Sequence, residues 1–389
     1  MAFLVLLDMF RQANDVYAIC SMTTRTVRTK SVLPLAKLVC YYGSWSVYRP
    51  GNGAFNVENI DPHLCTHLIY AFVGIDATGS IRILDSWNDI DKGAFRRFNE
   101  LKSKNPNLKT LIAVGGWREV SEAYSRMAGD RALRHNFINS AIMFMTTHGF
   151  DSFDIDWKYP AQRGGVPADK ANFATLVSEF RTAIGTRFLL SIATGATADH
   201  IANSYDVHII SNVSLEYIFI FKLYVHVSSN LDFINVMTYD LHGSWSGVTE
   251  ANAPLHSTAG VSVSQCIDAW IANGADPSKI VMGIPVYGRT FTLANPAVNG
   301  MGAPAPQPGN LELQTNPWTI VWDDAQKVPY AFRQNQWISC DNQQSVKSKM
   351  EFLRQRGLGG AMLWSIETDD FRGVRGNRYP ILTTIKNGL

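Results

Sequence analysis

Hydrophobic positions along the chain gather into short runs rich in branched and aromatic residues, and longer amphipathic stretches separate several of these runs. Eight runs have the length and composition of strands: KLVCYY from Lys37, HLIYAFVG from His67, LKTLIAVGG from Leu108, DSFDIDW from Asp151, RFLLSIAT from Arg187, LDFINVMTYD from Leu231, KIVMGIPVYG from Lys279 and GGAMLWS from Gly359. Two intervening stretches, residues 171–184 and 346–356, show the apolar spacing of helices that cover a core. This alternation is typical of repeated β/α units and a parallel sheet. Eight such units predict an α/β fold, the closed (β/α)8 or TIM barrel.

Two stretches do not fit the repeating pattern. The first, residues 1–36, opens with an apolar run that Asp8 interrupts and that no basic segment precedes. We interpret it as a leader or extension that is not a clean signal peptide, and residues 37–389 as the barrel. The second is the longest gap, between the seventh and eighth runs, and is rich in Pro and Gly at residues 296–317. We expect it to form a small insertion on the barrel rim, over about residues 292–345.

Composition and charge exclude several classes of function. The net charge of +2 is spread along 389 residues, which indicates neither nucleic acid nor an acidic membrane surface as a partner. Outside the leader, the longest apolar stretch, Ile218–Val227, is too short to span a bilayer and contains Lys222. No residues have metal-ligand spacing and no Gly-rich phosphate loop follows a strand, so we expect neither a metal nor a cofactor. The five cysteines are too few for a disulfide scaffold.

Polar residues gather where the predicted strands end, most clearly in the segment GFDSFDIDWKYP, residues 149–160. Side chains alternate across a strand, so Asp154, Asp156 and Lys158 share one face while the intervening apolar residues share the other. In a barrel this polar face points to the lumen and its mouth, where active sites form. Carboxylates are costly to bury unless they are paired, so their presence there indicates function rather than packing.

The same segment resembles the signature D-G-x-D-x-D-W-E-Y-P of glycoside hydrolase family 18, the chitinases. Four further segments resemble motifs of the third, sixth, seventh and eighth strands of that family: LKTLIAVGGW from Leu108, NVMTYDLHGSW from Asn235, GIPVYGRTF from Gly283 and GGAMLWSIETDDF from Gly359. The resemblance covers residues 37–386 and is strongest to insect-type secreted chitinases and chitinase-like proteins. It implies that the partner is chitin or its chito-oligosaccharides.

The resemblance also implies roles for individual residues. In the family a glutamic acid protonates the scissile oxygen, and the N-acetyl carbonyl of the substrate itself attacks the anomeric carbon. The aspartates that support this reaction match Asp154 and Asp156, and Tyr239 and Asp240 match residues that hold the acetamido group. Trp364 matches the floor on which the sugar stacks. Other cleft-lining positions match Tyr42, Phe72, Gly116, Trp117, Met237, Tyr287 and Arg289, with Trp45 and Tyr48 further along the groove.

At the position of the catalytic glutamic acid, this sequence has Lys158. A lysine ammonium has an ordinary pKa of about 10.4, so it is a poor proton donor near neutral pH. Its positive charge also lies beside a centre that becomes cationic in the transition state. Losing a general acid typically slows a reaction by ~10²–10⁴-fold. We therefore expect Lys158 to form an ion pair with Asp156, to fill the space of the glutamate and to leave the protein able to bind chitin without cutting it.

Two further matches concern the compartment and the chain itself. Cys40 and Cys65 match a family disulfide between the first two β/α units, which implies an oxidising, extracellular location. Residues 213–229, VSLEYIFIFKLYVHVSS, are inserted where the family passes directly into the sixth strand, and they resemble a translated intron. The rim insertion also looks shorter than the family's.

Three functions remain open from the sequence. The first is a secreted, catalytically silent chitinase-like protein, which we expect to be a monomer. The second is an active endo-chitinase, favoured by the intact Asp154, Asp156, Tyr239 and Asp240. The third is a non-functional gene copy or a faulty gene model, favoured by residues 213–229, the untidy leader and the shortened rim.

Overall fold

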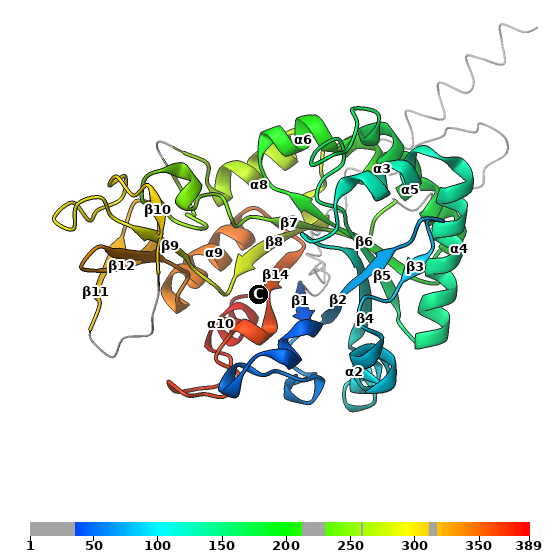
Figure 1. Ribbon diagram of the computed structural model, residues 1–389, viewed down its shortest axis with the longest axis horizontal. Helices are drawn as coiled ribbons and strands as arrows, with labels where there is room; N and C mark the ends of the chain where they lie inside the picture. The colour runs from blue at the N-terminus through cyan, green and yellow to red at the C-terminus, as the bar shows by residue number, and fades with distance from the viewer. Residues whose placement is uncertain (1–35, 212–229, 258–259, 311–316) are drawn as a thin grey trace, which may run out of the picture. The chain divides into compact units, whose positions relative to one another are not determined.

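The computed structural model describes residues 36–211, 230–257, 260–310 and 317–389 (Figure 1). Most of the expected leader, residues 1–35, lies outside the described residues, and so does the whole of residues 213–229. The interpretation of these two stretches as a leader and as a translated intron therefore stays a prediction.

Eight parallel strands form a closed barrel. They are β1 (Lys37–Gly43), β2 (His67–Ile75), β4 (Lys109–Gly115), β5 (Ser152–Asp156), β6 (Leu189–Gly195), β7 (Phe233–Met237), β8 (Ile280–Pro285) and β14 (Gly360–Trp364). Their order is β1-β14-β8-β7-β6-β5-β4-β2, and pairing of β1 with β2 closes the ring. A short strand, β3 (Ile81–Arg82), adds to β2 in the antiparallel sense. Each barrel strand matches one of the eight predicted runs, with β1, β2 and β6 extending one residue beyond theirs, so the predicted (β/α)8 barrel is confirmed.

Helices pack around the outside of these strands (Figure 1). They are α2 (Ala94–Lys104), α3 (Ser121–Gly129), α4 (Arg131–His148), α5 (Asp169–Ile184), α6 (Ala198–Ser204), α7 (Val207–Ser211), α8 (Val263–Ala272), α9 (Gln343–Gln355) and α10 (Pro380–Gly388). Local sequence sets several of their ends. Asp130 caps α4 by accepting hydrogen bonds from the amides of Ala132 and Leu133, and Gly149 ends it at φ 78°. The chain then enters β5, which carries the predicted polar face.

A second sheet lies between β8 and β14 in the chain. Its five antiparallel strands, coloured yellow to orange in Figure 1, run in the order β10 (Gln307–Pro308), β9 (Arg289–Thr292), β13 (Gln336–Ser339), β12 (Val328–Arg333) and β11 (Thr319–Asp323). It has a small core of its own, made by Phe291, Leu293, Ala303, Ala305 and Trp337. This sheet occupies the stretch where we expected an insertion on the rim.

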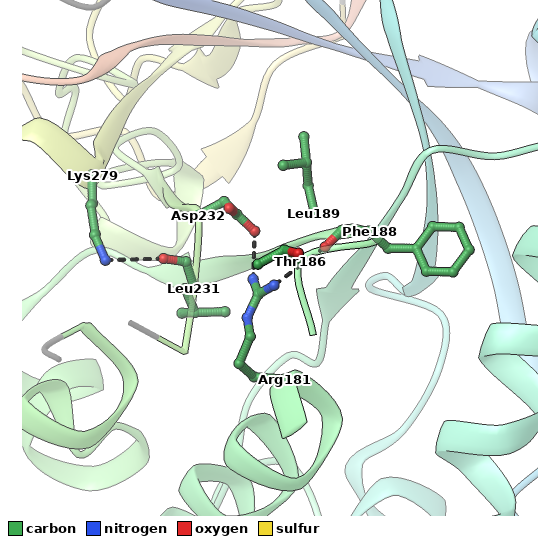
Figure 2. Close-up of a pocket in the computed structure, with 7 residues that line it drawn as sticks. All are labelled: Arg181, Thr186, Phe188, Leu189, Leu231, Asp232 and Lys279. Atoms are coloured by element: carbon green, nitrogen blue, oxygen red, sulfur yellow. Dashed lines mark hydrogen bonds and ion pairs between the residues drawn. The ribbon is translucent and has the colours of Figure 1, made fainter. Parts of the chain in front are cut away.

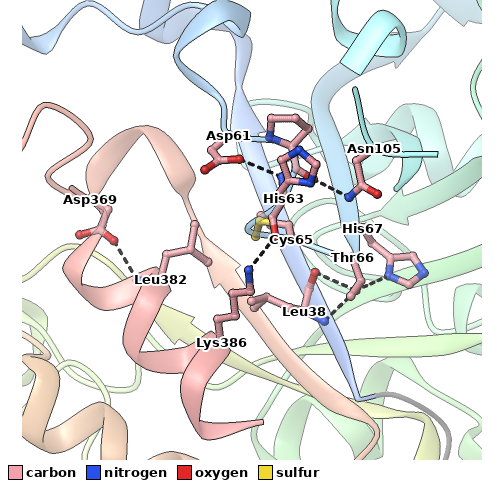
Figure 3. The surroundings of a disulfide bond; sticks show 12 residues. Leu38, Asp61, His63, Cys65, Thr66, His67, Asn105, Asp369, Leu382 and Lys386 are labelled. Atoms are coloured by element: carbon pink, nitrogen blue, oxygen red, sulfur yellow. Dashed lines mark hydrogen bonds between the residues drawn. A yellow bond between two sulfur atoms is a disulfide. The ribbon is translucent and has the colours of Figure 1, made fainter. Parts of the chain in front are cut away.

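The predicted disulfide between Cys40 and Cys65 is present, with 6.2 Å between the two Cα atoms (Figure 3). It links β1 to the turn that precedes β2, next to the hydrogen bond from the Leu38 amide to Thr66 Oγ1 at 2.8 Å. Lys386 of α10 donates to the backbone oxygen of His63 at 2.8 Å in the same turn. The disulfide therefore joins the first two β/α units where the chain also contacts the last helix.

Two other features are absent from the described residues. No helix there is long and apolar enough to cross a membrane. Nor does that part of the chain bring together three or more His, Cys, Asp or Glu side chains that could hold a metal ion.

Candidate functional site

Asp154 lies in the centre of the barrel lumen and is fully buried. Three other strands, β1, β6 and β7, supply its hydrogen bonds: Tyr41 Oη donates to Oδ2 at 2.7 Å, Ser191 Oγ to Oδ1 at 2.6 Å, and Asn235 Nδ2 to Oδ1 at 3.3 Å. Burial raises the pKa of Asp154 to about 7, because the three hydrogen bonds only partly offset the loss of water and the charge of Asp156 acts in the same direction. The side chain of Asp154 therefore binds a proton more readily than an exposed aspartate does.

Asp156 and Lys158 form the predicted ion pair. Nζ of Lys158 lies 3.3 Å from Oδ2 of Asp156, and the two side chains are 12% and 2% exposed. Nζ also contacts Sδ of Met237 at 3.1 Å and lies 5.7 Å from the ring centre of Trp364. Burial raises the pKa of Asp156, while the charge and hydrogen bond of Lys158 act in the opposite direction. The ammonium is thus enclosed by a carboxylate, a thioether and an indole.

Aromatic rings from the ends of β1, β2 and β14 form an apolar floor beside this pair. The ring centre of Trp364 lies 5.4 Å from that of Tyr41, 5.9 Å from Phe72 and 6.3 Å from Trp45. Gly116, at φ +89°, makes room for this floor, because a Cβ there would lie 2.7 Å from the ring of Phe72. Flat apolar rings of this kind suit the faces of sugar rings.

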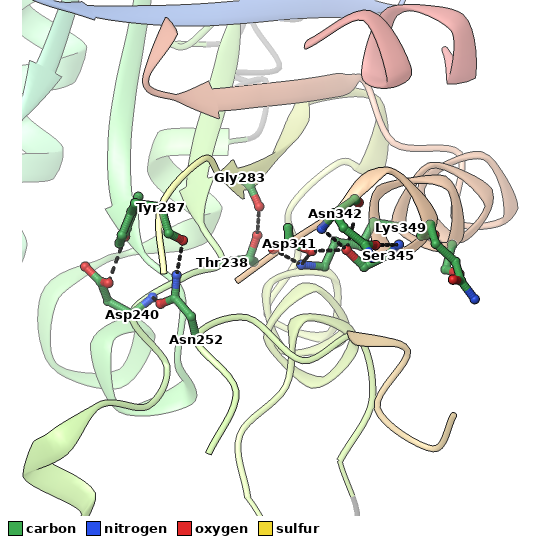
Figure 4. Close-up of polar contacts among 11 residues, drawn as sticks. Thr238, Asp240, Asn252, Gly283, Tyr287, Asp341, Asn342, Ser345 and Lys349 are labelled. Atoms are coloured by element: carbon green, nitrogen blue, oxygen red, sulfur yellow. Dashed lines mark hydrogen bonds and ion pairs between the residues drawn. The ribbon is translucent and has the colours of Figure 1, made fainter. Parts of the chain in front are cut away.

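A third carboxylate, Asp240, lies after β7 and is already paired (Figure 4). Its Oδ1 accepts from Tyr287 Oη at 2.7 Å and from Arg289 Nε at 2.9 Å. Asn252 holds both ends of this contact, accepting from the Asp240 amide at 3.0 Å and donating to the Tyr287 carbonyl at 3.3 Å. Tyr239 is buried and meets the ring of Tyr287 edge-on at 6.1 Å. This arrangement leaves Asp240 facing the site with its charge balanced by Arg289.

The remaining predicted residues lie at the rim. Trp117 is 63% exposed, and the guanidinium of Arg163 lies 3.9 Å from its ring centre. Arg163 also donates to the backbone oxygens of Lys158 and Trp117, each at 2.9 Å, so it ties the loop after β5 to the loop after β4. Tyr48 is exposed and donates to Asp85 at 2.7 Å.

The structure corrects one position. Tyr42 does not line the cleft; its ring is fully buried behind the barrel wall, 6.0 Å from Phe98 of α2 and 5.5 Å from Tyr70. Because successive side chains of a strand point to opposite faces, only one of two adjacent tyrosines can face the lumen. That residue is Tyr41, which contacts both Asp154 and Trp364.

Sequence reasoning also missed Ser191, Asn235 and Arg163. Ser191 and Asn235 each interrupt an apolar strand, LLSIATG and FINVM, and a polar residue inside a buried strand is a signal that could have indicated them. No comparable signal marks Arg163, because it lies in a polar loop where arginine is ordinary.

A pocket lies away from this site, at the other end of the barrel strands (Figure 2). Arg181, Thr186, Phe188, Leu189, Leu231, Asp232 and Lys279 line it, at the amino-terminal ends of β6, β7 and β8. Its arginine pairs with Asp232 and donates to the backbone oxygens of Asn230 and Phe188 at 2.9 and 3.3 Å. These contacts join the starts of neighbouring strands.

The protein is thus a parallel (β/α)8 barrel with carboxylates and an aromatic floor near the carboxyl ends of its strands. The model of glycosyl hydrolases family 18 matches residues 37–369, and the chain belongs to this family. Mouse (Mus musculus) chitotriosidase-1 is 37% identical over 383 residues, covering 91% of this chain and 78% of that protein.

Two solved structures extend the comparison. The group IV chitinase of Ostrinia furnacalis is 40% identical, with a TM-score of 0.83 over 91% of this chain and 99% of that one. Human YKL-39, a pseudo-chitinase with retained chitooligosaccharide binding properties, is 34% identical, with a TM-score of 0.79 over 91% of this chain and 99% of that one. The chain is therefore similar both to active enzymes and to an inactive binding protein.

Proposed function

We propose that this protein binds chitin or chito-oligosaccharides and does not hydrolyse them. The observation that carries the proposal is the ammonium of Lys158, held by Asp156 at 3.3 Å and enclosed by Met237 and Trp364. It occupies the position that the family signature gives to the catalytic glutamic acid. Neither the remaining carboxylates nor the tyrosines replace that acid in our proposal.

The chemistry of the ammonium argues against hydrolysis in two ways. Proton donation to a glycosidic oxygen requires an acid whose pKa lies near the working pH, and an ordinary lysine titrates near 10.4. The positive charge also opposes the cation that develops at the anomeric carbon. Asp156 also accepts a hydrogen bond from Lys158, so one of its carboxylate oxygens is already occupied before a sugar binds.

Aromatic and polar side chains near Lys158 support the binding part of the proposal. In our proposal the floor of Trp364, Phe72 and Trp45 stacks against the sugar, while Tyr239, Asp240 and Asp156 hold the acetamido group. Human YKL-39 supports the separation of binding from catalysis within this fold. Further proposed groove residues are Gly116, Trp117, Met237, Tyr287 and Arg289, together with Tyr41 in place of Tyr42.

The test measures hydrolysis and binding on the same preparation. No product should appear from a fluorogenic chitobioside or chitotrioside between pH 4 and 8, whereas N-acetylated chito-oligosaccharides should quench tryptophan fluorescence. Turnover within about tenfold of an ordinary chitinase would show that the protein is an enzyme, since loss of the acid should cost more than that. Absence of both activities would favour a non-functional chain.

Active hydrolysis is the second candidate, favoured by the 40% identity to the Ostrinia furnacalis chitinase and by the intact geometry around Asp154. The same assay decides between the two. The proposal also includes an extracellular location, supported by the Cys40–Cys65 disulfide, and a monomeric state. Size-exclusion chromatography with light scattering tests the latter.

A further inference from the structure

Glu367 lies in the short helix η7 (Ile366–Thr368), directly after β14, and its side chain is fully buried. Its carboxylate accepts from the Gly43 amide at 3.1 Å and from Ser365 Oγ at 2.6 Å. Arg49 reaches the same residue twice, with Nη2 3.5 Å from Oε1 and Nη1 3.0 Å from the backbone oxygen. One carboxylate thus connects the loop after the first barrel strand to the loop after the last.

The partners of this carboxylate flank the two indoles of the aromatic floor. Ser365 directly follows Trp364, and Gly43 precedes the short helix η1 (Ser44–Tyr48), which carries Trp45. A Cβ on Gly43 would lie 2.7 Å from Oε1 of Glu367 and 2.7 Å from the ring of Trp45, so the carboxylate and the indole both lie against this glycine. The contact leaves no room for a larger residue between them.

Trp45 also contacts two other rings of the floor. Its side chain is on a 3-10 turn, is 43% exposed, and contacts Phe72 and Trp364 at ring-centre distances of 6.1 and 6.3 Å. An exposed indole has rotational freedom that binding must remove, and a fixed neighbour reduces that entropic cost in advance. The turn that Glu367 contacts can therefore fix the position of the Trp45 ring.

We infer that Glu367 is a positioning residue, which sets the spacing between Trp45 and Trp364 and thereby the affinity for a sugar chain that contacts both. The inference rests on the proposed function for its ligand. It goes beyond that proposal because it assigns a role to a buried residue that touches no sugar.

A nearby carboxylate provides a matched control. Asp369 is two residues further along and is also buried, but it accepts from the amides of Leu382 and Asp370, each at 2.9 Å, and so holds the start of α10. Glu367→Gln and Asp369→Asn each remove one charge from the same segment. Both should lower the melting temperature, because each leaves a buried donor or acceptor without its partner.

Affinity for tetra-N-acetylchitotetraose separates the two roles. Glu367→Gln should weaken binding about tenfold while Asp369→Asn changes it less than about twofold, as expected if the sugar senses ring position and not stability. In a Trp45→Ala background, Glu367→Gln should have no further effect on affinity. An effect of Glu367→Gln that persists in Trp45→Ala, or an equal effect of Asp369→Asn, would overturn the inference.

A measurement made without any sugar tests the role of Glu367 independently of the proposed function. The near-ultraviolet circular dichroism difference between Glu367→Gln and wild type should share its bands with the difference for Trp45→Ala. If wild type binds no sugar, the proposed function fails while this spectrum still decides whether Glu367 positions the ring. If Glu367→Gln does not fold, Ser365→Ala removes one hydrogen bond to the carboxylate and should show the same effects at smaller amplitude; no spectral change in Ser365→Ala would then count against the inference.

Discussion

The ammonium of Lys158 lies 3.3 Å from Oδ2 of Asp156 and 3.1 Å from Sδ of Met237, inside the mouth of the barrel. Asp154, below this pair, takes its hydrogen bonds from Tyr41, Ser191 and Asn235 and makes none with the lysine. Lys158 therefore contacts the upper part of the site and makes no hydrogen bond to Asp154. This separation makes the effect of Lys158 testable on its own.

Lys158→Glu should give the protein some ability to hydrolyse a fluorogenic chitobioside. In our proposal, the change supplies a carboxylic acid at the position of the catalytic acid, beside Asp154 and Tyr239. The gain should be about 10²-fold or more over wild type, the lower end of what a general acid contributes. Lys158→Gln is the control, because it removes the positive charge without supplying an acid. Equal rates for the two variants would mean that other parts of the site have lost function.

Lys158→Met should destabilise the protein, because it leaves Asp156 buried without its cation. Breaking a buried ion pair typically costs about 3–5 kcal/mol, and the partial exposure of the lysine places this pair at or below the lower end. The double variant Lys158→Met/Asp156→Asn should recover most of the loss, since no unpaired charge then remains. Urea unfolding measures both. A double variant no more stable than Lys158→Met would show that the pair itself contributes little.

Trp364→Ala should reduce the affinity for chito-oligosaccharides by about tenfold or more, by analogy with the ~1–3 kcal/mol of base–aromatic stacking. The ring forms the centre of the floor, with Tyr41, Phe72 and Trp45 within 6.3 Å of it. The control is Trp322→Ala, on the edge strand β11 of the five-stranded sheet, and this variant should bind as wild type does. Equal affinity of wild type and Trp364→Ala would mean that the floor does not carry binding.

The barrel could be predicted from the sequence because its strands are buried and most of them are nearly continuous apolar runs; β5, SFDID, is the exception. The strands of the second, five-stranded sheet could not be predicted in this way. β9 and β11 are short and half-exposed, so their sequences, RTFT and TIVWD, do not stand out from a loop. The hydrophobic pattern of a sequence reports burial, whereas β9 pairs with β10 and β13, and β11 pairs with β12, through backbone hydrogen bonds that do not depend on side-chain type.

The candidate site was predictable where one segment carries it and less so where distant segments meet. The spacing of Asp154, Asp156 and Lys158 indicated a shared face and an ion pair, and the structure has both. The choice of Tyr42 over Tyr41 was wrong because the run KLVCYYG is apolar on both faces and does not show which tyrosine points inward. The contacts of Glu367 with Gly43 and Arg49 join residues more than 300 positions apart, which no local pattern reveals.

The pH dependence of stability should reveal the proton held by Asp154. Burial raises the pKa of this group from 3.8 to about 7, so the folded protein retains a proton that the unfolded chain releases. Because the folded state binds more protons between these two values, stability falls as the pH rises from about 4 to 7. Asp154→Asn carries no titratable proton and should flatten that part of the profile, measured by urea unfolding at several pH values. An unchanged slope in the variant would assign the dependence to other groups.

Deletion of residues 213–229 should leave sugar binding unchanged and should raise solubility or the melting temperature. The segment lies outside the described residues, but the chain on its two sides is held together. Asn230 Nδ2 donates to the Ile209 oxygen at 2.7 Å, and Lys279 Nζ donates to the backbone oxygens of Ser211 and Leu231 at 3.4 and 3.1 Å. A connection of a few residues between a helix and a barrel strand is ordinary, so the remaining Asn212 and Asn230 can link α7 to β7.

The same deletion removes an apolar, β-prone sequence that invites association. Loop length itself matters little, because closure entropy grows only with the logarithm of the length. These contacts also lie at the amino-terminal end of β7, while the proposed site lies at its carboxyl end beside Met237. Binding should therefore be unaffected even if stability changes. A deletion variant that unfolds would show that the segment is a structural element of the protein and not a translated intron.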